Sequence, residues 1–226
     1  MDLYSTKSKS ISQKTIILLL EIIIIGVSYW ILFSGGYHRI FPSESSNGNN
    51  IRHNIIFIFN CIVFVRICIT LLVFIKRKIQ WTEAFNIPIA FALYYIGFAL
   101  LGYKNNSDFG VWDISGIILF IGGSCINTFS ELLRYYWKKN PGNKGYLYTK
   151  GLFKYSMHIN YFGDLLWVSG YALVTGNIYS IFIIIFLFSF FAFYNIPMLD
   201  KHLASRYDEE FKNYKRETKK LIPFIY

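Results

Sequence analysis

Charged residues are scarce in this sequence of 226 residues: Asp, Glu, Lys and Arg make up 16%, against about 25% in a typical soluble domain. Cysteine is also rare. The three cysteines all fall inside apolar stretches, with neither disulfide nor metal-binding spacing, so we expect no metal site. Hydrophobic residues instead reach 54%, which excludes a disordered tail and a disulfide-stapled secreted module.

Long apolar runs dominate the chain. A helix that crosses about 30 Å of hydrocarbon needs about 20 residues, and most of these runs supply them. The fifth run is the shortest and contains Asp164 near its start. The sequence therefore predicts an all-α, polytopic membrane bundle of about six transmembrane helices, in a bacterial inner membrane or the endoplasmic reticulum. The runs cover residues 15–33, 54–75, 84–103, 111–129, 161–174 and 178–194.

The basic residues are distributed unevenly between the runs. The net charge of +10 does not indicate nucleic acid here, because the lysines and arginines lie between apolar runs. Most of them fall in the N-terminal segment, the loop after the second run, the loop after the fourth run and the C-terminal tail. The positive-inside rule then predicts that both termini are cytoplasmic. A single basic cluster is also compatible with simple attraction to anionic lipid.

One arginine interrupts the second apolar run. Burying Arg66 in the bilayer costs roughly 2.5–3.5 kcal/mol on insertion scales, so such a residue normally faces the bundle interior. We expect it to find an acidic or carbonyl partner, with Glu21 and Glu83 as the acidic candidates, or to extend to the cytoplasmic edge of the membrane.

Polar residues recur with helical spacing in the second half of the chain. Steps of four, three and four residues place one set on a single helix face, although an ordinary surface helix also shows such a stripe. Further along, Asn160, Asp164 and Trp167 share a face, and Gly163 would let a backbone or a ligand approach closely. The first set consists of Asn127, Glu131, Arg134 and Lys138.

These motifs resemble the C-terminal domain of the steroid 5α-reductase family, including its bacterial DUF1295 branch. The matching elements are Ile-Asn-x-x-Ser-Glu at 126–131, Gly-Leu-Phe at 151–153, Asn-Tyr-Phe-Gly-Asp at 160–164, Gly-Tyr-Ala-Leu at 170–173 and Leu-Ile-Pro-Phe at 221–224. The first 110 residues match more loosely. We therefore expect N-terminal transmembrane helices over 1–110 and a reductase-like domain with its cytoplasmic tail over 111–226.

The resemblance implies an enzyme that takes NADPH from the cytoplasmic side and reduces a carbon–carbon double bond next to a carbonyl in a lipid-like substrate. A sterol, a polyprenol-like chain or an unsaturated fatty-acyl group would fit. By that likeness Asn160 and Asp164 contact the nicotinamide–ribose portion, and the tail closes over the cofactor. The remaining cofactor-binding residues implied are Asn127, Glu131, Arg134, Lys138, His158, Tyr207 and Tyr214.

The substrate side departs from the family pattern. Steroid-reducing members hold the substrate carbonyl with a Glu–Tyr pair, and Glu21 matches the glutamate by position. Val63 stands where the tyrosine is expected, so Tyr94 or Tyr95 on the third run would have to substitute.

Two other classes remain open. Membrane methyltransferases that use S-adenosylmethionine share this C-terminal architecture, but they typically carry Arg-His-Pro where this chain reads Met-His-Ile-Asn at 157–160. Asn160 and the Leu-Ile-Pro-Phe ending favour the reductase, whereas His158 is compatible with methyl transfer. The third class is a non-catalytic membrane protein, such as a scaffold or a transporter subunit. The sequence leaves the oligomeric state open.

Overall fold

The computed structural model describes residues 8–44 and 48–226 of the chain. Within these ranges the chain forms helices and turns, and an isolated bridge pairs Ser156 with Lys219. The predicted all-α class is confirmed. The chain divides into two compact units. Unit 1 contains the residues up to 117 together with 171–180, and unit 2 contains 118–170 and 181–226.

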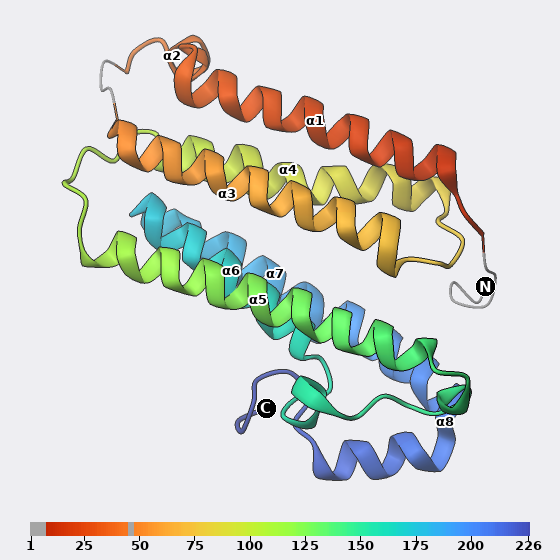
Figure 1. Ribbon diagram of the computed structural model, residues 1–226. Helices are drawn as coiled ribbons and strands as arrows, with labels where there is room; N and C mark the ends of the chain where they lie inside the picture. The colour runs from red at the N-terminus through yellow and green to blue at the C-terminus, as the bar shows by residue number, and fades with distance from the viewer. Residues whose placement is uncertain (1–7, 45–47) are drawn as a thin grey trace. The chain divides into compact units, whose positions relative to one another are not determined.

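Unit 1 is built on three long helices that pack against one another pairwise. They are α1 (Ile11–Phe33), α3 (Asn50–Ile69) and α4 (Trp81–Gly102), which run side by side in Figure 1. A short helix α2 (Gly36–Ile40) follows α1, and a π-helical turn η1 (Thr70–Phe74) extends α3. The unit also includes the first residues of α5 (Val111–Lys139), the last residues of α6 (Ile159–Thr175) and the turn η4 (Ile178–Ser180).

The helices of unit 1 bury narrow faces and expose the rest. On α1 the buried positions Ile17, Glu21 and Ser28 lie on one face, whereas Ile22 and Ile23 are more than half exposed. Broad exposed apolar surface of this kind is stable in a hydrocarbon environment. The pattern is that of helices facing lipid on the outside and packing inside through a narrow strip.

A buried hydrogen-bonded chain ties the helices of unit 1 together. The Asn60 side-chain amide donates to Ser28 Oγ at 2.8 Å, and its carbonyl oxygen accepts from the Tyr171 hydroxyl at 2.8 Å. The Tyr171 ring stacks on Phe98, with centroids 4.8 Å apart. Because all four residues are fully buried, these bonds satisfy polar groups that would otherwise be costly in lipid.

One end of unit 1 is closed by a buried ion pair. The Arg52 guanidinium binds Asp113 in a bidentate manner, with N–O distances of 2.8 and 2.9 Å. Its remaining nitrogen donates to the carbonyl oxygens of Asn105 and Ser107 at 3.1 and 2.9 Å. The arginine therefore fixes the loop between α4 and α5 to the start of α3.

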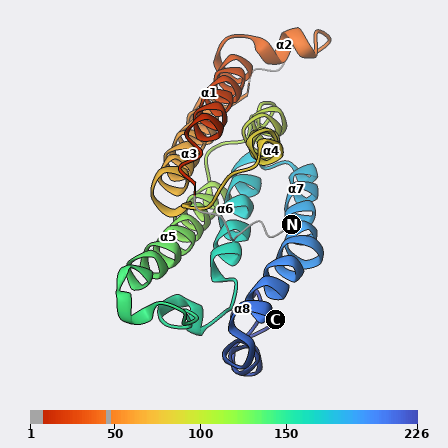
Figure 2. The same ribbon diagram turned by 90° about the vertical axis from the view of Figure 1, so that its right-hand side faces the viewer.

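Unit 2 contains the remaining helices, shown from a second side in Figure 2. The chain from Ile178 to Glu217 forms one continuous helical stretch. Within it Asp208 has a left-handed backbone angle (φ 33°, ψ −106°) and kinks the chain. The sixth apolar run was expected to end near residue 194, but the helix continues to Glu217. In order after α5, the elements are η2 (Pro141–Asn143), η3 (Gly151–Lys154), α6, α7 (Ile181–Phe190), η5 (Phe191–Asn195) and α8 (Ile196–Glu217).

Five helices in the described ranges are long and apolar enough to cross a membrane, so the chain is a multi-pass membrane protein. The prediction of about six spans also counts α6, which is shorter than these five: its 17 residues include Asn160 and Asp164 in the first turns. At 1.5 Å per residue this helix is about 26 Å long, shorter than the hydrocarbon core. The cytoplasmic orientation of both termini stays a prediction.

Candidate functional site

Two glycines allow α5 and α6 to touch through their backbones in unit 2. A Cβ atom on Gly123 would lie 2.5 Å from the Gly163 carbonyl oxygen, and one on Gly163 would lie 2.8 Å from the Gly123 carbonyl oxygen and 2.7 Å from the Asn127 nitrogen. Real Cβ atoms do not approach backbone this closely, so only glycine fits. The sequence suggested that Gly163 lets either a backbone or a ligand approach closely, and in the structure it is the backbone of α5 that does so.

This close crossing brings the predicted polar residues together. The Asn127 side-chain amide donates to Asp164 Oδ1 at 2.9 Å and to the Asn160 carbonyl oxygen at 3.1 Å. The Trp167 indole donates to the same carboxylate oxygen at 2.7 Å. Asp164 is therefore held by donors from both helices, and its carboxylate has one defined orientation.

The network continues one turn further along α5. The Asn160 side-chain amide donates to Glu131 Oε1 at 3.1 Å, and Glu131 forms an ion pair with Arg134. The helix face predicted from the spacing of Asn127, Glu131 and Arg134 is thus directed toward α6. It is an interhelical network and not a solvated surface stripe.

Three cations converge at the end of this network. Lys138 lies within electrostatic range of Arg134, of Glu131 and of Arg206, which comes from α8. Of these three charged groups two are cations, so together with Lys138 they carry an excess of positive charge. Such a cluster suits an anion of multiple charge.

An aromatic platform supports the Arg134 guanidinium. Its carbon lies 5.3 Å from the centre of the Phe153 ring, in the geometry of a cation–π contact. Phe153 packs in turn against Tyr148 and Trp137 in a buried cluster. Burial raises the pKa of the Tyr148 hydroxyl, so this tyrosine stays neutral beside the cations.

His158 occupies a buried position next to the network. Its Nε2 atom lies 2.8 Å from Asp200 Oδ1, and its ring is stacked with Tyr161, which stacks on Phe191. Tyr161 and Tyr207 both lie within electrostatic range of Arg134. His158 therefore lies close to the α5–α6 network through Tyr161, although its imidazole is already hydrogen-bonded to the Asp200 carboxylate of α8.

The tail of α8 is fastened to the segment that precedes α6. The Tyr214 hydroxyl donates to the Phe153 carbonyl oxygen at 2.6 Å, and Phe211 and Tyr214 pack against Met157. Beyond the helix, the backbone nitrogens of Met157 and His158 donate to the carbonyl oxygens of Lys219 and Lys220 at 2.8 and 3.1 Å. Tyr214 therefore has a clear role in holding the tail in place.

Sequence reasoning missed two residues of this neighbourhood, Asp200 and Arg206. Both lie on α8, beyond the end of the sixth apolar run. An available signal was the spacing of Asp200, Leu203 and Tyr207, which places an acid on the same helix face as a tyrosine that was already singled out.

A second group of predicted residues comes together in unit 1. Glu21 of α1 and Tyr95 of α4 are fully buried and lie close enough to act on each other electrostatically. Neither the Glu21 carboxylate nor the Tyr95 hydroxyl has a hydrogen-bond partner of good geometry in the described ranges. Tyr94 is also buried, but its ring stacks in parallel with Phe98. Of the two candidate tyrosines, the structure pairs Tyr95 with Glu21.

Arg66 lies in the same buried region, within electrostatic range of Tyr95 and Tyr171. The alternative acidic partner, Glu83, is engaged elsewhere. Its carboxylate binds the Arg77 guanidinium at 2.8 and 2.5 Å and accepts from the Gln80 backbone nitrogen, which caps the start of α4. Val63 is buried on α3, as expected for a residue that offers no polar group.

Fold and site together define a multi-pass helical membrane protein with a polar, cation-rich site in one unit and a buried carboxylate–phenol pair in the other. Residues 84–218 match the family described as "Protein of unknown function (DUF1295)", and the chain belongs to that family. The matched residues include the α5–α6 network, the three cations and Tyr95.

The chain is also similar to proteins of named activity. It is 31% identical over 113 residues to 3-oxo-5-alpha-steroid 4-dehydrogenase 1 of Rattus norvegicus, covering 50% of the chain and 41% of that protein. It is 28% identical over 170 residues to Steroid 5-alpha-reductase DET2 of Gossypium hirsutum, covering 67% of the chain and 62% of that protein. These similarities confirm the resemblance found in the sequence.

A third relative has a different name. The chain is 39% identical over 93 residues to the Probable O-methyltransferase ustE of Ustilaginoidea virens, covering 41% of the chain and 33% of that protein. The chain spans less than two thirds of the length of each of these three relatives.

Proposed function

We propose that this protein is a membrane reductase that uses NADPH to reduce a carbon–carbon double bond conjugated to a carbonyl in a lipid-like, steroid-like substrate. The observation that carries the proposal is the convergence of Arg134, Lys138 and Arg206 beside the hydrogen-bonded network of Asn127, Asn160 and Asp164. The similarity to the rat and cotton steroid reductases supports the same reaction class.

The residues present fit NADPH chemically. Its phosphate groups carry several negative charges, which three converging cations match, with Arg134 supported on an aromatic ring. Amide and carboxylate groups at the α5–α6 crossing offer donors and acceptors for a carboxamide and a ribose. When bound, NADPH supplies a hydride.

The buried pair in unit 1 offers groups that suit a substrate carbonyl. A substrate carbonyl oxygen would give the Tyr95 hydroxyl, or the acid form of Glu21, the hydrogen-bond partner that it lacks in the described ranges. Donation to that oxygen polarises the conjugated double bond and stabilises the charge that develops when hydride adds to the β-carbon. The apolar surroundings exclude water and suit a lipid-like molecule.

Cofactor binding to the purified protein in detergent tests the proposal. We expect saturable binding of NADPH, weaker binding of NADH, which lacks the extra phosphate, and none of S-adenosylmethionine. Binding of NADPH and NADH with equal affinity would contradict the role of the three cations. Absence of binding by either nucleotide would overturn the reductase.

A second candidate is a methyltransferase that uses S-adenosylmethionine and a lipid-like substrate. It is supported by the 39% identity to the O-methyltransferase of Ustilaginoidea virens and by a histidine at position 158. Binding of S-adenosylmethionine without NADPH in the same experiment would select it.

A further inference from the structure

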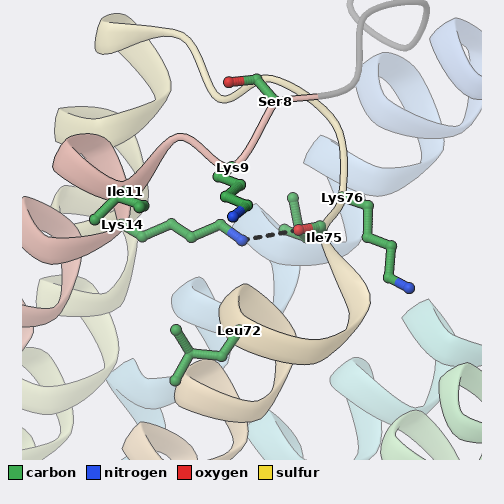
Figure 3. Close-up of a pocket in the computed structure, with 7 residues that line it drawn as sticks. All are labelled: Ser8, Lys9, Ile11, Lys14, Leu72, Ile75 and Lys76. Atoms are coloured by element: carbon green, nitrogen blue, oxygen red, sulfur yellow. Dashed lines mark hydrogen bonds between the residues drawn. The ribbon is translucent and has the colours of Figure 1, made fainter.

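A cavity of about 540 Å³ opens in unit 1 where α1 begins and α3 ends. Figure 3 shows its walls, which come from the start of α1 with the residues before it and from η1 with the residues after it. None of the residues proposed above for cofactor or substrate lines it. The lining residues are Ser8, Lys9, Ile11, Lys14, Leu72, Ile75 and Lys76.

The charged residues that line the cavity are all cations. They are Lys9, Lys14 and Lys76, and Figure 3 shows the Lys76 side chain directed away from Lys9 and Lys14. Lys14 Nζ donates to the Ile75 carbonyl oxygen at 2.9 Å, which occupies one of its three N–H groups and fixes the ammonium inside the cavity (Figure 3). The acid that follows in the sequence, Glu83, is neutralised by Arg77. Lys9 and Lys14 therefore give their side of the cavity positive charge.

The remaining wall of the cavity is apolar and exposed. Ile11 is 67% exposed and Leu72 is 64% exposed, and Ile75 lies between the lysines. Leu72 belongs to the π-helical turn, a distortion that is frequent at functional sites. A small inorganic anion would use the lysines but leave these side chains uncovered, whereas an acyl chain would cover them.

The two walls are connected by hydrogen bonds. The Ser8 nitrogen donates to the Lys76 carbonyl oxygen at 3.4 Å, and the Ile79 nitrogen donates to Ser10 Oγ at 3.0 Å. Ser10 is buried and has a left-handed backbone angle (φ 41°), which turns the chain into α1. The cavity is therefore preformed by a fixed pairing of segments 8–10 and 76–79.

We propose that this cavity binds an anionic phospholipid of the surrounding bilayer, with the phosphate beside Lys9 and Lys14 and the first part of an acyl chain against Ile11 and Leu72. The helices that form it can span a membrane, and the cavity lies at their ends, where lipid headgroups are found. The proposal does not depend on the reductase function.

Lipid retention by the detergent-purified, full-length protein tests this assignment. The probes are dioleoylphosphatidylglycerol and dioleoylphosphatidylcholine, titrated separately and followed by native mass spectrometry. We expect one phosphatidylglycerol per chain to bind at least tenfold more tightly than phosphatidylcholine. Equal affinities for the two lipids would overturn the proposal, and this comparison needs no variant.

Two double variants then locate the site. K9Q/K14Q should lose the tenfold preference, whereas K144Q/K150Q, which removes the same charge from exposed positions in unit 2, should keep it. K9R/K14R retains the charge and should also keep it. Retained preference in the first variant, or loss in the second, would contradict the site.

A competition experiment separates the two sources of a phosphate group. sn-Glycerol 3-phosphate carries the headgroup chemistry without acyl chains. At concentrations equal to the lipid it should not displace phosphatidylglycerol, because it leaves the apolar wall uncovered. Displacement at equal concentration would identify a site for free phosphate esters and overturn the assignment to a membrane lipid.

Discussion

Gly123 and Gly163 face each other across the α5–α6 crossing, so closely that a Cβ atom on either would lie under 3 Å from the carbonyl oxygen of the other. This contact sets the distance between the two helices, and that distance brings Asn127 within 2.9 Å of Asp164. A packing feature with no chemistry of its own therefore determines the geometry of the proposed cofactor site.

Gly123→Ala is expected to destabilise the protein and weaken NADPH binding. Overpacking costs about 1–3 kcal/mol, and the better helix propensity of alanine offsets up to about 1 kcal/mol of it. Thermal unfolding in detergent should show a lower midpoint. Gly122→Ala is the matched control, because a Cβ there meets nothing within 4 Å, and it should be neutral or stabilising. Equal effects of the two substitutions would refute the close crossing as the cause.

Lys138→Gln is expected to weaken NADPH binding about tenfold at low salt, because charge-assisted contacts to phosphate are lost. The salt dependence of the dissociation constant should decrease as well, whereas NADH binding should change less. Lys139→Gln removes the same charge from the adjacent residue, which contacts the Tyr135 and Tyr136 rings, and should leave the affinity near the wild-type value. If both variants bind NADPH like the wild type, Lys138 is only a surface cation.

Asn160→Ala is expected to weaken NADPH binding while the protein stays inserted and folded. The substitution removes the hydrogen bond to Glu131 and a polar group at the proposed nicotinamide end of the site. Equilibrium titration of NADPH measures the effect, and size-exclusion profiles in detergent report on folding. Asn213→Ala, at an exposed position of α8, serves as the control. Normal cofactor binding by the Asn160 variant would show that the site is assigned incorrectly.

Tyr95→Phe is expected to reduce turnover by about 100-fold without changing NADPH affinity, because it removes a donor to the substrate oxygen. NADPH oxidation with an enone steroid as the test substrate measures the rate. Tyr94→Phe deletes the hydroxyl of the neighbouring residue on α4 and, if Tyr95 is the donor, should have a much smaller effect. The reverse order of effects would transfer the role to Tyr94.

Arg52→Gln is expected to lower thermal stability strongly. It leaves Asp113 buried without its counter-charge, and breaking a buried pair costs about 3–5 kcal/mol. Lys104→Gln breaks the ion pair between Lys104 and Glu44. Because both side chains of this pair are exposed, the substitution should shift the unfolding midpoint little. Comparable shifts in the two variants would mean that burial of the Arg52 pair does not control stability.

Much of the architecture could be predicted because its causes are local. Apolar runs long enough to cross a bilayer must form helices there, since backbone groups find no other partners in hydrocarbon. The spacing of Asn127, Glu131 and Arg134 likewise predicts a shared helix face wherever that helix lies. The apolar pattern did not predict where the last helix ends. The sixth apolar run stops at residue 194, whereas the helix continues through the polar residues of α8.

The site could be predicted only in part. Asn127, Glu131, Asn160 and Asp164 were identified as candidates, and the structure brings them into one network. Arg206 and Asp200 were missed because their relation to α5 and α6 depends on how α8 packs. The same limit applied to Tyr94 and Tyr95, whose side chains leave the helix about 100° apart.

The sequence by itself determined the helical membrane class, the helix faces that carry polar groups and the family resemblance, because composition and periodicity act within a single helix. Only the tertiary structure decided which faces meet: Gly123 against Gly163, Tyr95 beside Glu21, and Arg206 near Lys138. The physical reason is that these contacts join segments distant along the chain, and their energies depend on interhelical distance and rotation, which no local pattern encodes.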